Sequence, residues 1–535
     1  MASTYQTPGI YIEEVNSGPR PIEGVGTAVA AFVGFAPACP EGYDNKPFLV
    51  TNWSQYVKNF GVGAEEGPKN PHMDGWYMSH SVYGFFANGG GRCYITRINT
   101  TADPASVPLE RKQLASKMPN TPAFTLELKP GVNSVTVEIQ APSDPEAGEG
   151  AFNLKVKSGA LEEPTYENVV VGRGPKNART RDVAEAVRTS TLIKVLEVAT
   201  VGSLAERMPE FASHTIAPSI TTGKLSVQPL HFIGDVSVRS GIEGFEIADD
   251  VTMVCVPDLM AAFQQGLIDE MGVRQVQTSL IAHCQRMQDR MAILDPLPNQ
   301  SPQDVNKWRD ASNFDSPFAT LYYPWLEIGN PTTDAEKPKT LAIPPSGHIA
   351  GIWARSDSAR GVHKAPANEV ILGVLKPVSD TKSLGEQRIT DGEQALLNPN
   401  GVNCIRSFTN MGIRVWGART VSSDPAWRYV NVRRLFNFVE KSIERGTQWV
   451  VFEPNDQDLW ARVRRDVGAF LTGVWRDGAL FGNTPDEAFF VKCDEETNPP
   501  DVRDRGQLII EVGLAPVKPA EFVIFRFSQY AGGGA

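Results

Sequence analysis

The stretch that decides the fold reads NPNGVNCIR at residues 398–406, VWGART at 415–420 and WRYV at 427–430, and then enters a helical pattern. Apolar side chains recur after Asn431 at the spacing of one helical face, namely at Val432, Leu435, Phe436, Val439 and Ile443. Asn431 is the expected N-cap, and Arg445 and Gly446 supply the cation and the glycine that favour a helix C-terminus. The pattern predicts one amphipathic helix packed on a core.

A second helix is predicted to follow. Residues 449–452 form an apolar run that indicates a short buried strand, and a helix then starts at Asn455, with carboxylates in its first turn, where the helix dipole favours them. Its inward face is expected to hold Trp460, Val463, Val467, Phe470 and Val474. Three arginines lie off that stripe and point to solvent or to a partner: Arg462, Arg464 and Arg465. The pattern alone favours a solvated helix face over a contact surface.

Three separated regions of the sequence resemble contractile tail sheath proteins of bacteriophages and of phage-tail-like injection particles. The first is the C-terminal stretch above, the second is TPGIYIEE at residues 7–14, and the third comprises PPSGHIAG at 344–351 and RGVHKAPAN at 360–368. The regions occur in the family's order. The resemblance implies a structural subunit that forms a helical homo-oligomer around an inner tube protein and contracts to drive that tube through a target envelope. It also implies baseplate and terminal cap proteins as partners.

The resemblance further implies that the two ends of the chain link neighbouring subunits. An N-terminal strand and a C-terminal strand are expected to add to the sheet of a neighbour's C-terminal domain. The linking residues are expected to be Ile10, Tyr11, Ile12, Phe522, Ile524, Phe525 and Phe527. The C-terminal strand, residues 521–527, is apolar on both faces, so it should be covered by another chain or by its own domain. Because the family's C-terminal domain lies nearest the inner tube, Arg462, Arg464 and Arg465 are the expected tube contacts.

The expected fold class is α/β and α+β in several domains. A parallel-sheet α/β core, residues 25–100 and 231–397, is interrupted by an inserted β-rich outer domain at 101–230, where three segments alternate with period two before a predicted helix at 183–198. An α/β C-terminal sheath domain follows at 398–515. Extended strand arms are expected at 1–24 and 516–535.

Two aspartates form the most enzyme-like feature of the sequence. Asp258 and Asp295 follow predicted parallel strands directly, and ligands bind at the carboxyl ends of such strands. Both also adjoin prolines in predicted turns, where local Asx hydrogen bonding is a sufficient reason for them. An α/β hydrolase that uses Asp258, Asp295 and His348 is therefore one alternative function. A static surface-layer or adhesion protein that uses the inserted domain is another. No nucleophile elbow surrounds any serine, and Ser346 follows two prolines in an expected loop.

Composition and motif content exclude several other functional classes of protein. A formal net charge of -11 argues against a nucleic-acid-binding surface, because affinity for phosphate backbones comes mainly from clustered Lys and Arg. The 6 cysteines form no CxxC pair and are expected to be reduced core residues, and no cofactor or metal motif is present. No secretory signal or apolar run of membrane-spanning length is found, so no direct membrane insertion is expected. Taken with the resemblance to tail sheath proteins, this absence implies the cytoplasm of the producing bacterium as the expected location, within a phage tail or an injection particle that can be released.

Overall fold

The computed structural model describes residues 21–63, 69–99, 111–116, 122–129, 135–158, 161–172, 179–216, 227–331, 338–379, 381 and 385–526. The chain divides into two compact units, of which one comprises residues 1–99 and 227–535 and the other residues 100–226. The linking residues Ile10, Tyr11, Ile12 and Phe527 lie outside the described residues.

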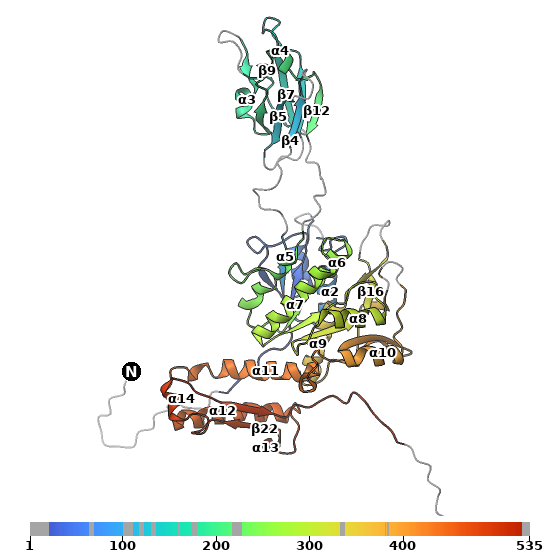
Figure 1. Ribbon diagram of the computed structural model, residues 1–535, viewed down its shortest axis with the longest axis vertical. Coiled ribbons are helices and arrows are strands. Elements are labelled where there is room, and N and C mark those ends of the chain that lie inside the picture. Colours follow the sequence, from blue (N-terminus) through green and yellow to red (C-terminus); the bar gives the residue numbers. More distant parts are fainter. Residues whose placement is uncertain are drawn as a thin grey trace, which may run out of the picture. The chain divides into compact units, whose positions relative to one another are not determined.

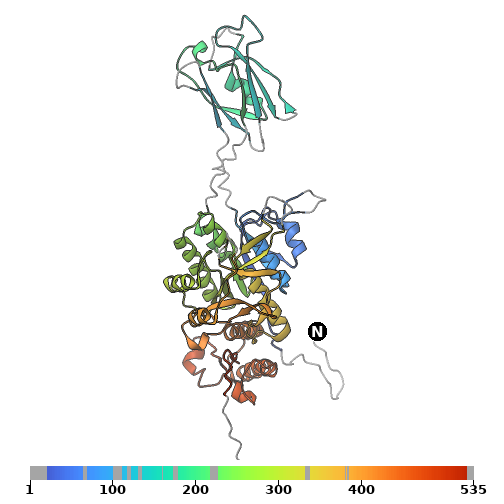
Figure 2. The same ribbon diagram turned by 90° about the vertical axis from the view of Figure 1, so that its right-hand side faces the viewer.

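The larger unit is built on a nine-stranded mixed sheet (Figures 1 and 2). Its strands, in spatial order, are β18 (Glu369–Val370), β21 (Gly412–Trp416), β20 (Val402–Phe408), β15 (Ala319–Tyr323), β14 (Met291–Leu294), β13 (Met253–Cys255), β1 (Val29–Gly34), β3 (Arg92–Arg97) and β2 (Pro47–Val50). The pairs from β20 across to β3 are parallel, and β18, β21 and β2 are added antiparallel at the edges. The central strands are fully buried, as expected of a parallel sheet with both faces covered.

Helices follow the strands as the α/β alternation predicts. They are α1 (Trp53–Phe60), α2 (Met78–Ala87), α5 (Pro229–Ile233), α6 (Asp258–Gln264), α7 (Glu270–Met287), α8 (Pro302–Ser312), α9 (Ser346–Arg360) and α10 (Asp391–Leu397). A smaller sheet holds β16 (Trp325–Gly329) between β17 (Thr340–Ile343) and β19 (Val374–Val378). The 6 cysteines are free thiols, and all except the half-buried Cys39 are buried, as predicted.

Helices α2 and α9 approach each other through glycines. A Cβ on Gly351 of α9 would lie 2.5 Å from the Phe85 carbonyl oxygen, and one on Gly347 would lie 2.4 Å from the Ser81 carbonyl oxygen. From the other side, a Cβ on Gly84 of α2 would meet the His348 ring at 2.3 Å. The absence of side chains at these positions therefore allows the two backbones to pack in direct contact.

The C-terminal part of this unit has its own apolar cluster. It contains α11 (Val430–Gly446), α12 (Gln457–Arg476), α13 (Pro485–Ala488), β22 (Phe489–Lys492), α14 (Pro500–Asp504) and β23 (Glu511–Leu514). Leu435 and Val439 of α11 pack with Trp460, Val463 and Val467 of α12, which confirms most of the two predicted apolar faces.

Two local predictions in this region are wrong. Tyr429, not Asn431, is the N-cap of α11, because Asn431 is buried and its amide donates to the carbonyl groups of His363 and Val517. The predicted strand at 449–452 is instead a 3-10 turn at Gln448–Val450 followed by an exposed turn. No strand lies beside this run in the described residues, so Phe452 is fully solvent-exposed with a φ of 69°.

The smaller unit is a β-rich body with its own core. One sheet runs β10 (Arg181–Asp182), β9 (Tyr166–Val170), β7 (Phe152–Ser158), β6 (Val135–Gln140), β12 (Ser213–Ile216), with β8 (Leu161–Glu162) beside β7, and another runs β11 (Ile193–Val198), β5 (Pro122–Leu128), β4 (Arg111–Ala115). The predicted helix at 183–198 is wrong over its second half. Helix α3 (Val183–Ala186) and a 3-10 turn end at Ser190, whose hydroxyl accepts from the Leu192 and Ile193 N–H groups. Strand β11 then pairs with β5.

Candidate assembly surfaces

The three predicted tube-contact arginines have different environments on α12. Arg462 and Arg465 are exposed, with side-chain exposures of 45% and 52%. Arg462 lies over the Trp449 ring at 5.5 Å, and Arg465 Nε donates to Asp466 at 3.0 Å. Arg464 is half-buried and donates to the Cys493 carbonyl at the end of β22. Two of the three guanidinium groups are therefore presented at the surface, while Arg464 joins α12 to the sheet.

Beyond Glu521 the chain presents consecutive apolar side chains to solvent. Phe522, Val523, Ile524 and Phe525 are between 70% and 77% exposed. The described part of the predicted strand at 521–527, residues 521–526, forms no strand in this single chain. A run of four exposed apolar residues is costly in water, since each loses the free energy of apolar burial.

The β22–β23 sheet has two strands among the described residues, so each strand has an edge without a strand beside it. Residues 489–492 pair antiparallel with 511–514, from Phe489 opposite Leu514 to Lys492 opposite Glu511. Phe490 of β22 and Phe481, which precedes α13, are both exposed. Open edges next to exposed aromatic side chains are typical of a sheet that accepts further strands.

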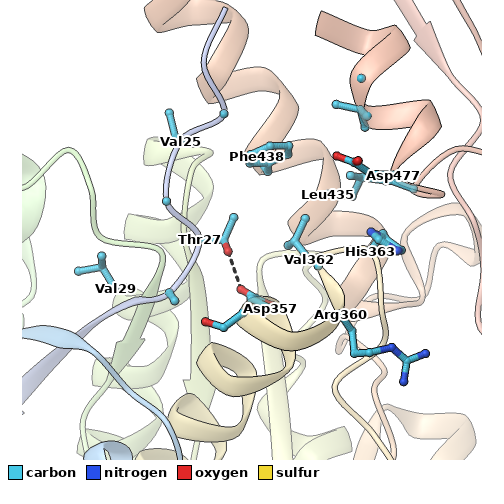
Figure 3. A pocket seen from close by; sticks show the side chains of 18 of the residues that line it. Val25, Thr27, Val29, Asp357, Arg360, Val362, His363, Leu435, Phe438 and Asp477 are labelled. Atoms are coloured by element: carbon cyan, nitrogen blue, oxygen red, sulfur yellow. Dashed lines mark hydrogen bonds between the residues drawn. The ribbon is translucent and has the colours of Figure 1, made fainter.

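A cavity of about 1140 Å³ lies where the N-terminal segment passes between α9, α11 and α12 (Figure 3). Val25 and Thr27 line it from the N-terminal segment, Phe438 from α11 and Asp477 from the end of α12. Residues 360–363, at the end of α9, also line the cavity. They belong to a motif that carried part of the family resemblance. The motif therefore lies where the sheet-bearing part of the unit meets its C-terminal helices.

A buried ion pair fixes the N-terminal segment beside this cavity. Arg434 of α11 donates to both carboxylate oxygens of Asp357, at 2.9 and 2.5 Å, and also to the Thr27 carbonyl at 2.9 Å. The Thr27 hydroxyl donates to the same carboxylate at 2.7 Å. Because both charged side chains are almost fully buried, removing one partner would leave an uncompensated charge. This network joins three segments that are far apart in the sequence.

The aspartates of the hydrolase alternative act as structural caps. Asp258 accepts from the backbone N–H groups of Phe35, Tyr77 and Met78, so it caps the start of α2. Asp295 accepts from the Ser346 N–H at 2.9 Å and from its hydroxyl at 2.6 Å, so it caps α9. The local Asx explanation is wrong for both, since the donors are distant in sequence. Ser346 is the first residue of a helix and does not lie in a loop.

Burial is the main cause of the pKa shifts of these side chains. It raises the pKa of Asp258 and of Asp295 to about 7, and it lowers the pKa of His348 to about 4. The His348 Nδ1 has no hydrogen-bond partner among the described residues, and its ring packs on Gly84. These side chains therefore support helix packing and do not assemble a nucleophile with a base.

Among the described helices, none combines the length and the apolarity that a bilayer crossing requires. In the same part of the chain, no cluster of His, Cys, Asp or Glu side chains has the arrangement of a metal site.

Sequence reasoning missed the side chains that anchor the last segment. Glu521 binds Arg419, Asn398 and Tyr429, although apolar periodicity indicated no role for it beyond the first position of an apolar strand. No periodicity marks a single carboxylate whose partners are about 100 residues away. Its pairing depends on tertiary structure alone.

Comparisons with known proteins agree with this architecture. The family models "phage tail sheath protein central domain" and "phage tail sheath C-terminal domain" match residues 251–421 and 422–529. The tail sheath protein of Salmonella phage ViI is 26% identical over 260 residues, which are 47% of this chain and 39% of that protein. The chain therefore spans less than half of that relative's length.

Solved structures match over nearly the whole chain. A chain of the anti-feeding prophage (AFP) baseplate is 25% identical with a TM-score of 0.55, covering 98% of this chain and 100% of that one. A chain of the AFP helical sheath in the contracted state is 24% identical with a TM-score of 0.57, at the same coverages. The two family models define a structural protein of the phage-tail type. The chain belongs to the tail sheath protein family.

Proposed function

We propose that the protein is the sheath subunit of a contractile tail or injection particle. Copies of the chain polymerise helically around an inner tube protein, and the sheath then contracts to drive that tube through a target envelope. The observation that carries the proposal is that one chain has both an exposed apolar segment and a sheet with open edges. A run of exposed apolar residues, 522–525, leaves the body, and a two-stranded sheet with open edges is available to receive such a segment.

The linking arms are residues 1–24 and 516–535 in this proposal. Ile10, Tyr11 and Ile12 of one arm and Phe522, Ile524, Phe525 and Phe527 of the other add as strands to β22–β23 of neighbouring copies. Each backbone hydrogen bond of such a junction contributes about 0.5–1.5 kcal/mol, and buried apolar side chains add to this.

The proposal includes a division into domains: a sheath core interrupted by an outer β-rich domain near residues 101–230, then a C-terminal sheath domain. The family models support a start for that last domain at residue 422, later than the 398 expected from sequence.

Further partners complete the particle. The inner tube contact is assigned to α12 through Arg462 and Arg465, with Arg464 supporting the helix, and baseplate and terminal cap proteins bind the ends of the sheath. Assembly takes place in the cytoplasm of a producing bacterium, into a phage tail or an injection particle, and the phage and injection-system sources of the similar proteins support the second part of this assignment. No nucleic acid, cofactor or membrane insertion enters the proposal.

Negative-stain electron microscopy of the purified full-length protein tests the proposal. Helical tubes are expected at micromolar concentrations. Flat lattices would favour the alternative of a static surface-layer protein. Monodisperse particles that never form tubes, at any concentration or salt, would contradict the sheath function.

A further inference from the structure

The C-terminal arm is tied to the body at two successive places. The first tie is made by backbone hydrogen bonds directly after β23. The Ala515 N–H donates to the Ala488 carbonyl, the Phe481 N–H to the Ala515 carbonyl, and the Val517 N–H to the Ala479 carbonyl. Residues 515–517 are therefore fixed to the last residue of α13 and to the loop that follows α12.

The second tie is a single carboxylate four residues later. Glu521 accepts from Arg419 Nη2 at 2.6 Å and Nε at 2.9 Å, from the Asn398 amide at 2.7 Å and from the Tyr429 hydroxyl at 3.0 Å. Arg419 also donates to the Asn398 carbonyl at 3.2 Å. We call these four residues, Glu521, Arg419, Asn398 and Tyr429, the arm latch. Its two-pronged arginine–carboxylate geometry is the most directional form of ion pair in proteins.

The latch differs from an ordinary surface ion pair in its burial. The side chains of Arg419 and Glu521 are 9% and 20% exposed. Burial alone would raise the pKa of Glu521, but the hydrogen bonds from Arg419 and Asn398 outweigh it and hold the pKa below its usual value. An exposed pair would be worth little, whereas this carboxylate would lose several donors at once if it moved.

The latch crosses the border between the two family domains. Asn398 and Arg419 belong to the central domain, residues 251–421, whereas Tyr429 and Glu521 belong to the C-terminal domain, residues 422–529. The side chains directly after Glu521 are exposed. The base of the arm is thus held on the central domain, although the arm follows a strand of the C-terminal domain.

We propose that the arm latch fixes the point and direction at which the C-terminal arm leaves the subunit, so that the arm reaches a second copy of the chain in one orientation. Glu521 is a positioning residue, and the arm beyond it makes the contact. This inference rests on the proposed sheath function. Without the latch, residues 518–521 would pivot about Val517, and each arm would search many directions before pairing.

The test measures arm direction and assembly separately. Nitroxide labels are placed on the full-length chain at Val523→Cys in the arm and Ala395→Cys on the exposed face of α10, in a Cys39→Ser background, because the other native thiols are buried. Pulsed electron paramagnetic resonance of the unassembled subunit then gives the distance distribution. We expect a narrow distribution with Glu521 intact, a broad one with Glu521→Ala, and an intermediate width with Tyr429→Phe.

Light scattering follows tube formation by the same variants without labels. We expect the initial rate to fall about tenfold for Glu521→Ala, and circular dichroism should show that the subunit is still folded. Glu386→Ala, which removes the exposed ion pair with Arg388, is the matched control and should match the wild type in both measurements. A narrow distribution for Glu521→Ala, or a broad one with a normal assembly rate, overturns the proposal. If the wild type forms no tubes, the sheath function itself fails, and the distances still decide whether Glu521 fixes the arm.

Discussion

Gly351 lies where α9 touches α2, and the contact leaves no room for a side chain. We predict that Gly351→Ala destabilises the larger unit by about 1–3 kcal/mol, because a methyl group there must push two backbones apart. Urea unfolding followed by circular dichroism measures the change. Gly468→Ala on α12 is the control, since nothing lies within 4 Å of its added Cβ, and it should be neutral or stabilising by up to about 1 kcal/mol. Equal midpoints for the two variants would contradict the prediction.

Asp295 makes stability depend on pH. Its pKa is raised to about 7 in the folded protein, so between about pH 4 and 7 the folded state keeps a proton that the unfolded state has lost. The stabilisation from this proton is present at low pH and is lost as the pH rises through 7, at up to about 1.4 kcal/mol per pH unit.

Asp295→Asn removes this dependence and retains an acceptor for the Ser346 N–H. We expect the variant to gain stability relative to the wild type between pH 5 and pH 8. Denaturant unfolding of the wild type and the variant at both pH values gives the difference between their free energies of unfolding. The opposite pH dependence that comes from neutral, buried His348 is present in both proteins and therefore cancels in this difference. Asp391→Asn, on a side chain that is 94% exposed, is the control. A wild-type-minus-variant difference that does not change with pH would rule out a raised pKa at Asp295.

At the scale of single elements, the arginines of α12 have two roles: Arg462 and Arg465 present charge at the surface, whereas Arg464 joins the helix to the end of β22. We predict that the double variant Arg462→Glu, Arg465→Glu folds and still forms tubes, but yields few extended particles loaded with an inner tube. Exposed ion pairs contribute only about 0–1 kcal/mol each and weaken with salt, yet they repeat along a tube. Electron microscopy of particles assembled with the inner tube protein counts the loaded fraction.

Arg464→Glu serves as the contrast. It should lower the stability of the subunit by about 1–3 kcal/mol, because it removes the donor to the Cys493 carbonyl and turns a carboxylate toward it. Loaded particles at normal yield from the double variant would show that α12 carries a solvated face and nothing more.

The arms give a second prediction at this scale. Removing residues 1–20 should leave a folded subunit that no longer polymerises, because this segment is assigned to a neighbour's sheet. Ile12→Pro is the milder variant, since it deletes one ladder donor. Sedimentation and circular dichroism distinguish loss of assembly from loss of folding. Tubes of normal length from the truncated chain would contradict the assignment.

Apolar periodicity predicted the helices and strands that bury one face. It missed the features whose structure depends on contacts with residues distant in the sequence. The strands and helices of the sheet core and the inward face of α12 follow from apolar spacing alone. By contrast, Ile193 pairs with Leu128 in β11, and no local signal distinguishes that strand from a continued helix. Residues 449–452 have a strand composition without a strand beside them. Glu521 is recognisable only once Arg419 lies next to it.

At the scale of the whole molecule, the smaller unit is independent in its packing. Its core contains side chains from residues 114–216, separate from the clusters of the larger unit. We predict that replacing residues 100–226 by a short Gly/Ser linker leaves the larger unit folded and able to form tubes. Calorimetry should show the loss of one unfolding transition while the other keeps its midpoint. Loss of cooperative unfolding altogether would show that the two units are not independent.

The order of strands in the large sheet has a consequence for synthesis. Strand β1 pairs with β3 on one side and with β13 on the other, and the register of the second pair joins Ala30 to Met253, residues separated by 223 positions. A ribosome adding 5–20 residues per second needs about 10 to 45 s to cover that distance. During this interval the apolar edge of β1 has no partner strand from its own chain. Until β13 has been synthesised, this edge of a nascent subunit is therefore open to pairing with another chain.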